Sequence, residues 1–298
     1  MISRRHFIAS CVAATTLAAV AKNLPDKKER WAPADVTALN LALAELERAS
    51  QGRLGVSLLD RGSGQVASYR GDERFLMLSS FKTLAAAYVL ARSDQGIDQL
   101  SRRISITEED MLEYAPVTRR HIGPRGMTLA ELCHATITTS DNTAANLILR
   151  SYGGPQALTQ FIRSLGDTIT RHDRYEPELN QSHSVEPMDT TSPNAMSNTL
   201  NTLLLGSALK PESRQLLQSW LMANTTGDRR LRAGVPPSWI VGEKTGTAGL
   251  GANDVGFIQA PSGSPVIVSV YLETDTIAAP ERDQIIAAVG KRAAELML

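Results

Sequence analysis

The apolar residues of this 298-residue chain recur at two different spacings. Near both ends, short apolar or alternating runs bounded by turn residues are typical of strands. They cover residues 54–59, 65–69, 239–247, 255–260 and 266–272. Elsewhere the apolar residues recur about every 3.6 positions, which indicates helices. The predicted helices cover residues 35–50, 83–90, 128–134, 141–151, 155–165, 192–205 and 280–298.

The predicted strands come from both ends of the chain, and most of the helices come from its middle. A sheet assembled in this way gives two lobes that are not separate in sequence. We therefore expect one domain over residues 22–298, with an α/β lobe from about residues 30–70 and 220–298 and an all-α lobe from about 71–219. Residues 166–191 lack periodicity, and long irregular loops of this kind tend to be functional.

Positive and negative side chains balance, with 31 Lys and Arg against 31 Asp and Glu. A content of 42% hydrophobic and 21% charged residues is typical of a soluble globular protein, and the length suffices for a sizeable core. A chain without a basic excess has no electrostatic footprint for nucleic acid, so we expect no nucleic-acid partner. We also expect a monomer.

The first 21 residues have the pattern of a signal peptide. Arg4 and Arg5 precede Phe7 and an apolar stretch, and residues 19–21 form an A-x-A cleavage site. The paired arginines favour the twin-arginine route. A general secretory signal, with the arginines as its positive region, is the alternative. The apolar run is shorter than the ~20 residues of a spanning helix, so we expect a periplasmic protein with no membrane span in the mature chain.

A possible nucleophile precedes the helical run at 83–90. Ser79 and Lys82 form an S-x-x-K pattern, and residues three apart on a helix are neighbours. Lys82 is therefore expected to hydrogen-bond Ser79 and, if neutral, to accept its proton, which would make Ser79 a nucleophile. Alone, this pattern arises by chance in most chains of this length and marks a solvated helix face.

Two further triplets follow Ser79 in order. The first is S-D-N at residues 140–142, and the second is K-T-G at residues 244–246. Separately they are a helix N-cap and a strand end that runs into a turn. Together with S-x-x-K they are the signature shared by class A β-lactamases and penicillin-binding proteins.

A fourth segment distinguishes these two families. Residues 174–180, RYEPELN, resemble the E-x-x-L-N box in the Ω-loop of class A β-lactamases, which penicillin-binding proteins lack. The resemblance covers nearly the whole chain after residue 21. The chain is therefore identified as a member of the class A serine β-lactamases, and it resembles the chromosomal, twin-arginine-exported cephalosporinases of Gram-negative bacteria.

The resemblance implies a fold and a substrate class. The fold would be α+β, shared with penicillin-binding proteins, with a five-stranded antiparallel sheet flanked by helices, an all-α lobe and an active site in the groove. The substrates would be penicillins and cephalosporins, with no cofactor. In the loop at 166–191, the resemblance implies a salt bridge between Arg174 and Asp189 and a cis bond before Pro177.

The resemblance also implies catalytic roles. Ser79 would attack the β-lactam carbonyl, and its proton would pass to Lys82 directly or to Glu176 through a water; both routes stay open. Ser140 would relay the proton to the departing ring nitrogen. Glu176 and Asn180 would position and deprotonate the water that hydrolyses the acyl-enzyme.

The remaining implied residues bind the substrate. Asn142 would bind its side-chain amide, Thr245 its carboxylate, and Tyr114 would lie at the mouth of the groove. The backbone N–H groups of Ser79 and Thr247 would form the oxyanion hole. Residues 252–254 supply no arginine, so Arg230 is the expected carboxylate anchor. Lys244 would lie near Ser140, Gly246 completes the motif, and Asp141 would cap local backbone donors.

Zinc and disulfide chemistry find no support in the sequence. The five histidines have no zinc-binding spacing, so we expect no metal. Without Cys11, Cys133 would remain as a lone, buried apolar residue. Some relatives bridge cysteines at the positions that Leu78 and Ala248 occupy here. Because carbapenemases of the family often carry that pair, we expect weak carbapenem hydrolysis.

Two other functions share part of the signature. A penicillin-binding DD-peptidase would be trapped by β-lactams instead of hydrolysing them, and Glu176 and Asn180 argue against it. A penicillin sensor that stays acylated would signal through a membrane partner and would need a spanning segment.

Overall fold

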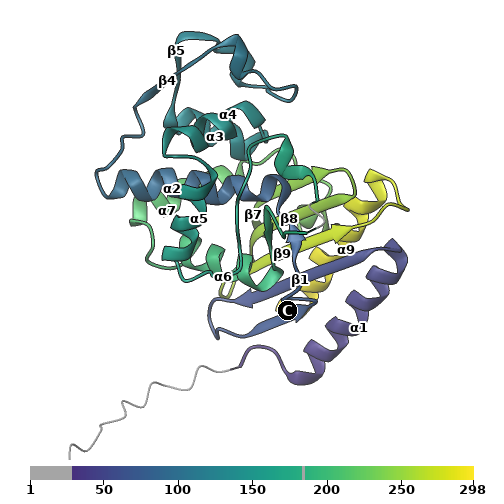
Figure 1. Ribbon diagram of the computed structural model, residues 1–298. Helices are drawn as coiled ribbons and strands as arrows, with labels where there is room; N and C mark the ends of the chain where they lie inside the picture. The colour runs from purple at the N-terminus through teal and green to yellow at the C-terminus, as the bar shows by residue number, and fades with distance from the viewer. Residues whose placement is uncertain (1–28, 183–184) are drawn as a thin grey trace, which may run out of the picture.

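The strands predicted near both ends of the chain form one antiparallel sheet. The computed structural model describes residues 29–182 and 185–298, so the predicted signal peptide lies outside the described residues. The strand order is β2-β1-β9-β8-β7, as Figure 1 shows. The strands are β1 (Arg53–Asp60), β2 (Val66–Tyr69), β7 (Ile240–Ala248), β8 (Gly251–Gln259) and β9 (Val266–Glu273).

The register extends β8 beyond its prediction. The strand was expected to begin at residue 255, but it begins at Gly251 because Gly251 pairs with Ala248 across a tight turn. Thr245 then lies opposite Asp254, and Gly246 opposite Asn253. The polar residues at 253 and 254 hide this part of the strand in the hydrophobic pattern.

Helices cover both faces of the sheet. The terminal helices α1 (Pro33–Ser50) and α9 (Ala279–Met297) pack against each other and on one face, where Leu43, Val270 and Ile286 are buried. Helix α6 (Pro193–Leu204) packs on the other face against β1 and β9. Figure 1 shows the sheet between these layers.

The middle of the chain forms the second lobe around α2 (Phe81–Asp94), whose residues from Phe81 to Ala87 are all buried. Its surrounding helices are α3 (Leu129–Thr138), α4 (Asn142–Ser151), α5 (Pro155–Ser164) and α7 (Pro211–Met222). One buried cluster includes side chains of this lobe and Val255, Phe257 and Tyr271 of the sheet. The two lobes therefore share a core.

The lobe that was expected to be all-α also contains short strands. β3 (Phe75–Leu76) pairs with β6 (Thr190–Thr191), and β4 (Arg103–Ile106) pairs with β5 (Gly123–Thr128). These strands are defined by pairing between distant residues, which a local apolar pattern does not reveal. Short helical segments complete the described elements: η1 (Leu78–Ser80), η2 (Glu108–Asp110), η3 (Thr118–Arg120), η4 (Glu178–Asn180) and α8 (Leu231–Gly234). Within the described ranges, no helix combines the length and apolar character needed to span a membrane.

Candidate active site

Ser79 lies where α2 meets the sheet. The preceding Leu78 has a left-handed φ of 48°, and the 3₁₀ turn η1 leads into α2. Asn253 on β8 donates from Nδ2 to the carbonyl oxygens of Leu76 and Met77, at 2.9 and 3.0 Å. These contacts fix the backbone that presents Ser79.

Gly246 lets β7 pass directly beside Ser79. A Cβ at Gly246 would lie 2.9 Å from Leu78 Cβ and 3.1 Å from the backbone nitrogen of Ser79. A real side chain would force these segments apart. The glycine of K-T-G therefore brings the β7 backbone, and with it Thr247, next to Ser79.

Lys82 is fully buried and bonded to three other motif residues. Its Nζ donates to Asn142 Oδ1 at 2.5 Å and to Ser140 O at 2.9 Å, and it lies 3.1 Å from Glu176 Oε1. The predicted hydrogen bond between Lys82 and Ser79 was wrong. Among the described residues, Lys82 donates to Ser140 and Asn142 and not to Ser79. The three protons of the ammonium group are directed to the other partners.

Burial lowers the pKa of Lys82, and the nearby Glu176 carboxylate partly offsets this effect. Desolvation disfavours the charged form of an amine, whereas an opposite charge favours it. The Lys82 amine is thus easier to deprotonate than a lysine in water.

Glu176 receives hydrogen bonds from two of the predicted site residues. Ser79 Oγ donates to Glu176 Oε1 at 3.4 Å, and Asn180 Nδ2 donates to Oε2 at 2.6 Å. Asn146 was not predicted; its side-chain amide exchanges two hydrogen bonds of 2.9 Å with the Glu176 backbone. Asn146 lies one helical turn after Asn142 on α4, and that spacing was the available signal.

Ser140 lies between the two lysines. Its Oγ accepts hydrogen bonds from Lys82 Nζ at 3.2 Å and from Lys244 Nζ at 3.1 Å. Ser140 has a left-handed φ of 61°, a conformation that costs energy for a non-glycine residue. Burial and the Lys82 ammonium lower the pKa of Lys244 well below its usual range.

Asp141 secures the turn that carries Ser140. Its carboxylate accepts hydrogen bonds from Ala144 N at 2.8 Å, at the start of α4, and from Val117 N and Thr118 N at 2.9 Å. The expected capping contacts are confirmed.

The side chains converge on a cavity of about 330 Å³. Tyr114 lines this cavity and is 51% exposed. Thr226 was not predicted; its hydroxyl bonds to Thr245 Oγ1. The cavity is lined by Ser79, Tyr114, Ser140, Asn142, Glu176, Asn180, Thr226, Thr245 and Thr247.

Comparisons with known proteins assign the chain to a family. The sequence model of the β-lactamase enzyme family matches residues 38–297. The chain is 43% identical to β-lactamase L2 of Stenotrophomonas maltophilia over the full length of both proteins. It is 46% identical to a β-lactamase of Streptomyces albus G, over 86% of this chain and 83% of that protein. The chain belongs to the β-lactamase enzyme family.

Solved structures specify the class. The class A β-lactamase of the last common ancestor of Gram-negative bacteria matches with a TM-score of 0.85 and 55% identity, over 87% of this chain and 98% of that one. A β-lactamase from Xanthomonas campestris matches with a TM-score of 0.86 and 46% identity, over 89% and 99%. The protein is a class A serine β-lactamase, which hydrolyses β-lactams and confers antibiotic resistance. The expected fold is confirmed.

Arg230 of the β-lactamase lies behind the cavity lining. It is 6% exposed, and its guanidinium donates to Thr247 Oγ1 at 2.6 Å and to Gly246 O at 2.9 Å. Nε donates to Asp283 Oδ1 at 2.7 Å. Arg230 therefore contacts the cavity through Thr247. Lys82 and Lys244 also lie outside the lining, and both donate hydrogen bonds to Ser140. Gly246 lies outside it as well, next to the backbone of Ser79.

The loop that carries Glu176 is closed by the predicted ion pair. Arg174 Nε lies 2.6 Å from Asp189 Oδ2, and Asp189 Oδ1 accepts the backbone N–H groups of Asp173 and Arg174. The bond between Glu176 and Pro177 is cis, as expected.

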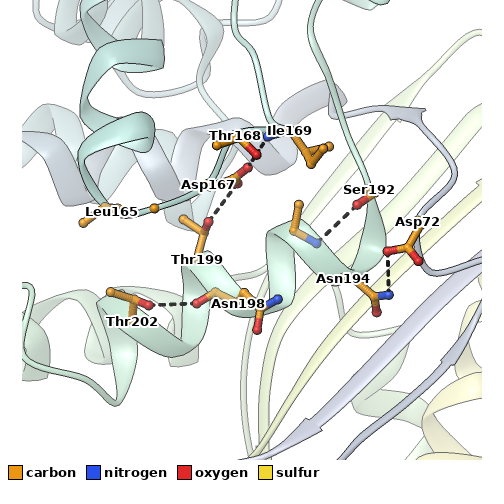
Figure 2. A pocket seen from close by; sticks show the side chains of 12 residues that line it. Asp72, Leu165, Asp167, Thr168, Ile169, Ser192, Asn194, Asn198, Thr199 and Thr202 are labelled. Atoms are coloured by element: carbon orange, nitrogen blue, oxygen red, sulfur yellow. Dashed lines mark hydrogen bonds between the residues drawn. The ribbon is translucent and has the colours of Figure 1, made fainter.

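A second hollow of similar volume, about 330 Å³, lies at the start of this loop and the first turns of α6 (Figure 2). Its buried Asp167 accepts hydrogen bonds from Thr170 and from Thr199 Oγ1. Asp72 accepts one from Asn194. Asp167 therefore links the loop to α6 through Thr199, and Asp72 links the segment between β2 and β3 to the first turn of α6. Among the described residues, no group of three His, Cys, Asp or Glu side chains is placed to bind a metal ion.

Proposed function

We propose that the β-lactamase hydrolyses penicillins and cephalosporins through an acyl-enzyme on Ser79. The observation that carries this proposal is the convergence on the Glu176 carboxylate of Ser79 Oγ, Lys82 Nζ and Asn180 Nδ2. A hydroxyl bonded to a carboxylate can lose its proton as it attacks a carbonyl. The same carboxylate then serves the second step, in which water attacks the acyl-enzyme.

Glu176 or Lys82 takes the Ser79 proton in the first step. The hydrogen bond from Ser79 to Glu176 favours Glu176, directly or through a water. The lowered pKa of Lys82 supports the alternative, in which a neutral amine accepts the proton. In both routes the proton reaches the bonded pair of Lys82 and Glu176, and Lys82 can pass it on to Ser140 as Ser140 protonates the ring nitrogen.

Ser140 delivers a proton to the departing ring nitrogen. It accepts hydrogen bonds from Lys82 and Lys244, so a proton that leaves Ser140 can be replaced from either lysine. The backbone N–H groups of Ser79 and Thr247 stabilise the oxyanion, and each such donor contributes ~3 kcal/mol. The close passage of Gly246 beside Ser79 supports this pairing.

The remaining lining residues orient the substrate. Thr245 and Thr247 bind its carboxylate, and the Arg230 guanidinium adds positive charge behind the Thr247 hydroxyl. Asn142 binds the side-chain amide, and Tyr114 packs against the substrate at the mouth. Asn180 holds the hydrolytic water next to Glu176.

Turnover of a chromogenic cephalosporin by the purified protein tests the proposal. A serine hydrolase with a working second step gives many turnovers per enzyme molecule, and Ser79→Ala abolishes them. A single stoichiometric burst, followed by a stable adduct, would instead identify a penicillin-binding DD-peptidase or sensor.

We also propose that the protein is exported to the periplasm by the twin-arginine route and acts as a monomer. Arg4 and Arg5 before an apolar stretch support this route. Both arginines lie outside the described residues.

A further inference from the structure

Two carboxyl groups lie buried side by side beneath the K-T-G strand. Glu243 on β7 and Asp254 on β8 are both completely inaccessible to solvent. In the register Asp254 lies opposite Thr245, two residues from Glu243 on the same strand. Both carboxyl groups therefore lie on the same face of the sheet, as diagonal neighbours within hydrogen-bonding reach.

Each carboxyl group uses one oxygen to hold the segment at residues 227–232. Glu243 Oε1 accepts Arg232 Nε at 3.0 Å, and Asp254 Oδ2 accepts the backbone N–H of Leu231 at 3.1 Å. A Cβ at Gly227 would lie 2.1 Å from Glu243 Oε1, so this backbone rests directly on the carboxyl group. The other oxygens, Glu243 Oε2 and Asp254 Oδ1, have no hydrogen-bond partner in the described part of the chain.

We propose that Glu243 and Asp254 share one proton and act as a single positioning pair for the segment that carries Arg230. Two ionised carboxylates cannot hydrogen-bond each other, and burying both would be costly. One proton between Oε2 and Oδ1 satisfies both oxygens and leaves one negative charge. That charge partly offsets the charge of three nearby cations. Arg232 lies beside Glu243, and Arg230 and Lys244 lie near Asp254.

The electrostatics of the site agree with the geometry. Burial raises the pKa of Glu243, and the Asp254 carboxylate raises it further. Burial also raises the pKa of Asp254, while Arg230 opposes this effect.

The pair would act on the reaction through Arg230. Arg230 directly precedes the residues that these contacts hold, and its guanidinium donates to Thr247 Oγ1, which lines the cavity. This inference rests on the proposed carboxylate-binding role of Thr247 and Arg230. A displaced segment would raise KM for the β-lactam more than it lowers kcat.

Amide and apolar substitutions separate a shared proton from simple packing. In Glu243→Gln the amide N–H can donate to Asp254 Oδ1, and in Asp254→Asn the amide can donate to Glu243 Oε2. Both variants should keep kcat/KM within about twofold of the parent. Glu243→Leu provides no donor and should lower kcat/KM about tenfold or more, mainly through KM, as expected when a buried charged acceptor loses its partner. Equal damage from Gln and Leu would overturn the shared proton, and three unchanged variants would overturn the positioning role.

Infrared spectroscopy of the purified parent enzyme tests the proton without using activity. At neutral pH the spectrum should contain the carbonyl band of a buried protonated carboxyl group, and Glu243→Gln should remove it. The absence of this band would overturn the proposal even if Glu243→Leu did not fold. If the band is present but Arg230→Ala leaves the kinetics unchanged, the assigned role of Arg230 fails and the proton pair stands.

Discussion

At the scale of single residues, one substitution should separate the acylation step from the deacylation step. Glu176 receives hydrogen bonds from Ser79 and Asn180, and it lies 3.1 Å from the Lys82 amine. If Glu176 activates the hydrolytic water, Glu176→Ala should still be acylated, more slowly, but deacylation should stall. Mass spectrometry after brief exposure to benzylpenicillin should then show the protein heavier by one intact ligand.

A second substitution provides the control for this experiment. Adding Ser79→Ala to Glu176→Ala should abolish the mass shift, because the acyl group then has no hydroxyl to bond. Turnover by Glu176→Ala near the parent rate, without an adduct, would mean that another group activates the water.

Arg230 and Arg229 are adjacent but differ in burial. Arg230 is 6% exposed and bonded to Thr247, whereas the Arg229 side chain is 81% exposed. Arg230→Ala should lower kcat/KM for a cephalosporin. The loss should correspond to ~1.5 to 3 kcal/mol of transition-state binding, the range for a hydrogen bond to a charged group. Arg229→Ala is the matched control and should have little effect, because exposed ion pairs contribute little. If Arg230→Ala kept the kcat/KM of the parent, as Arg229→Ala should, another cation would have to bind the substrate carboxylate.

At the scale of elements, the loop that carries Glu176 packs on α2 through His172. Its ring stacks on Phe81 with 4.2 Å between centroids, and its Nδ1 lies 3.4 Å from Asp189 Oδ1. In the described residues neither ring nitrogen has a hydrogen-bond partner. Burial lowers the pKa of His172 to about 4, although the Glu176 and Asp173 carboxylates oppose this effect.

This shift predicts a loss of stability in acid. The unfolded chain binds the proton below a pKa of about 6.5, whereas the folded chain binds it only near 4. The free energy of unfolding should therefore decrease as the pH falls from about 6.5 to about 4, by up to roughly 3 kcal/mol. His172→Leu, which keeps the apolar contact with Phe81, should remove this part of the pH dependence in urea denaturation.

His134 on α3 is exposed and provides the control. The parent and His134→Leu should lose stability in parallel over this range, while His172→Leu loses less. Three parallel curves would mean that His172 is already satisfied in the fold and does not resist protonation.

The elements also show where the sequence was sufficient and where it was not. The five sheet strands were predicted because their apolar runs are local. Helix α7 was not predicted, although Pro211 begins it. Its buried apolar residues, Leu217, Trp220 and Leu221, all lie in its second half, so the apolar pattern does not cover the whole helix. The pairing of β3 with β6 joins residues more than 110 positions apart, and no local pattern encodes it.

The same division applies within the site. The motifs identified most of the side chains that line the cavity, because residue type and spacing are read directly. They did not predict the partners of Lys82, since Ser140 and Asn142 lie 58 and 60 positions away and compete successfully with Ser79 for its protons. The position of Arg230 behind Thr247 likewise depends on how far a folded side chain reaches.

At the scale of the whole molecule, the two lobes share one buried cluster while the sheet combines both halves of the chain. A cut between the lobes would expose Val255, Phe257 and Tyr271, which are buried against the helical lobe. The chain can therefore form its active site only after both ends have been synthesised. A protein that folds before transport would need a route that carries folded proteins, and the paired arginines near the N-terminus fit such a route.

Substitution of both arginines by lysine tests this export route. The twin-arginine signal is read through its guanidinium groups, whereas a general secretory signal needs only positive charge, which lysine preserves. Arg4→Lys with Arg5→Lys should therefore abolish β-lactamase activity in the periplasmic fraction and leave it in the cytoplasm. Arg48→Lys, on the exposed side of α1, is the matched control and should be exported normally. Unchanged periplasmic activity in the double variant would instead assign the chain to the general secretory pathway, with Arg4 and Arg5 serving only as its positive region.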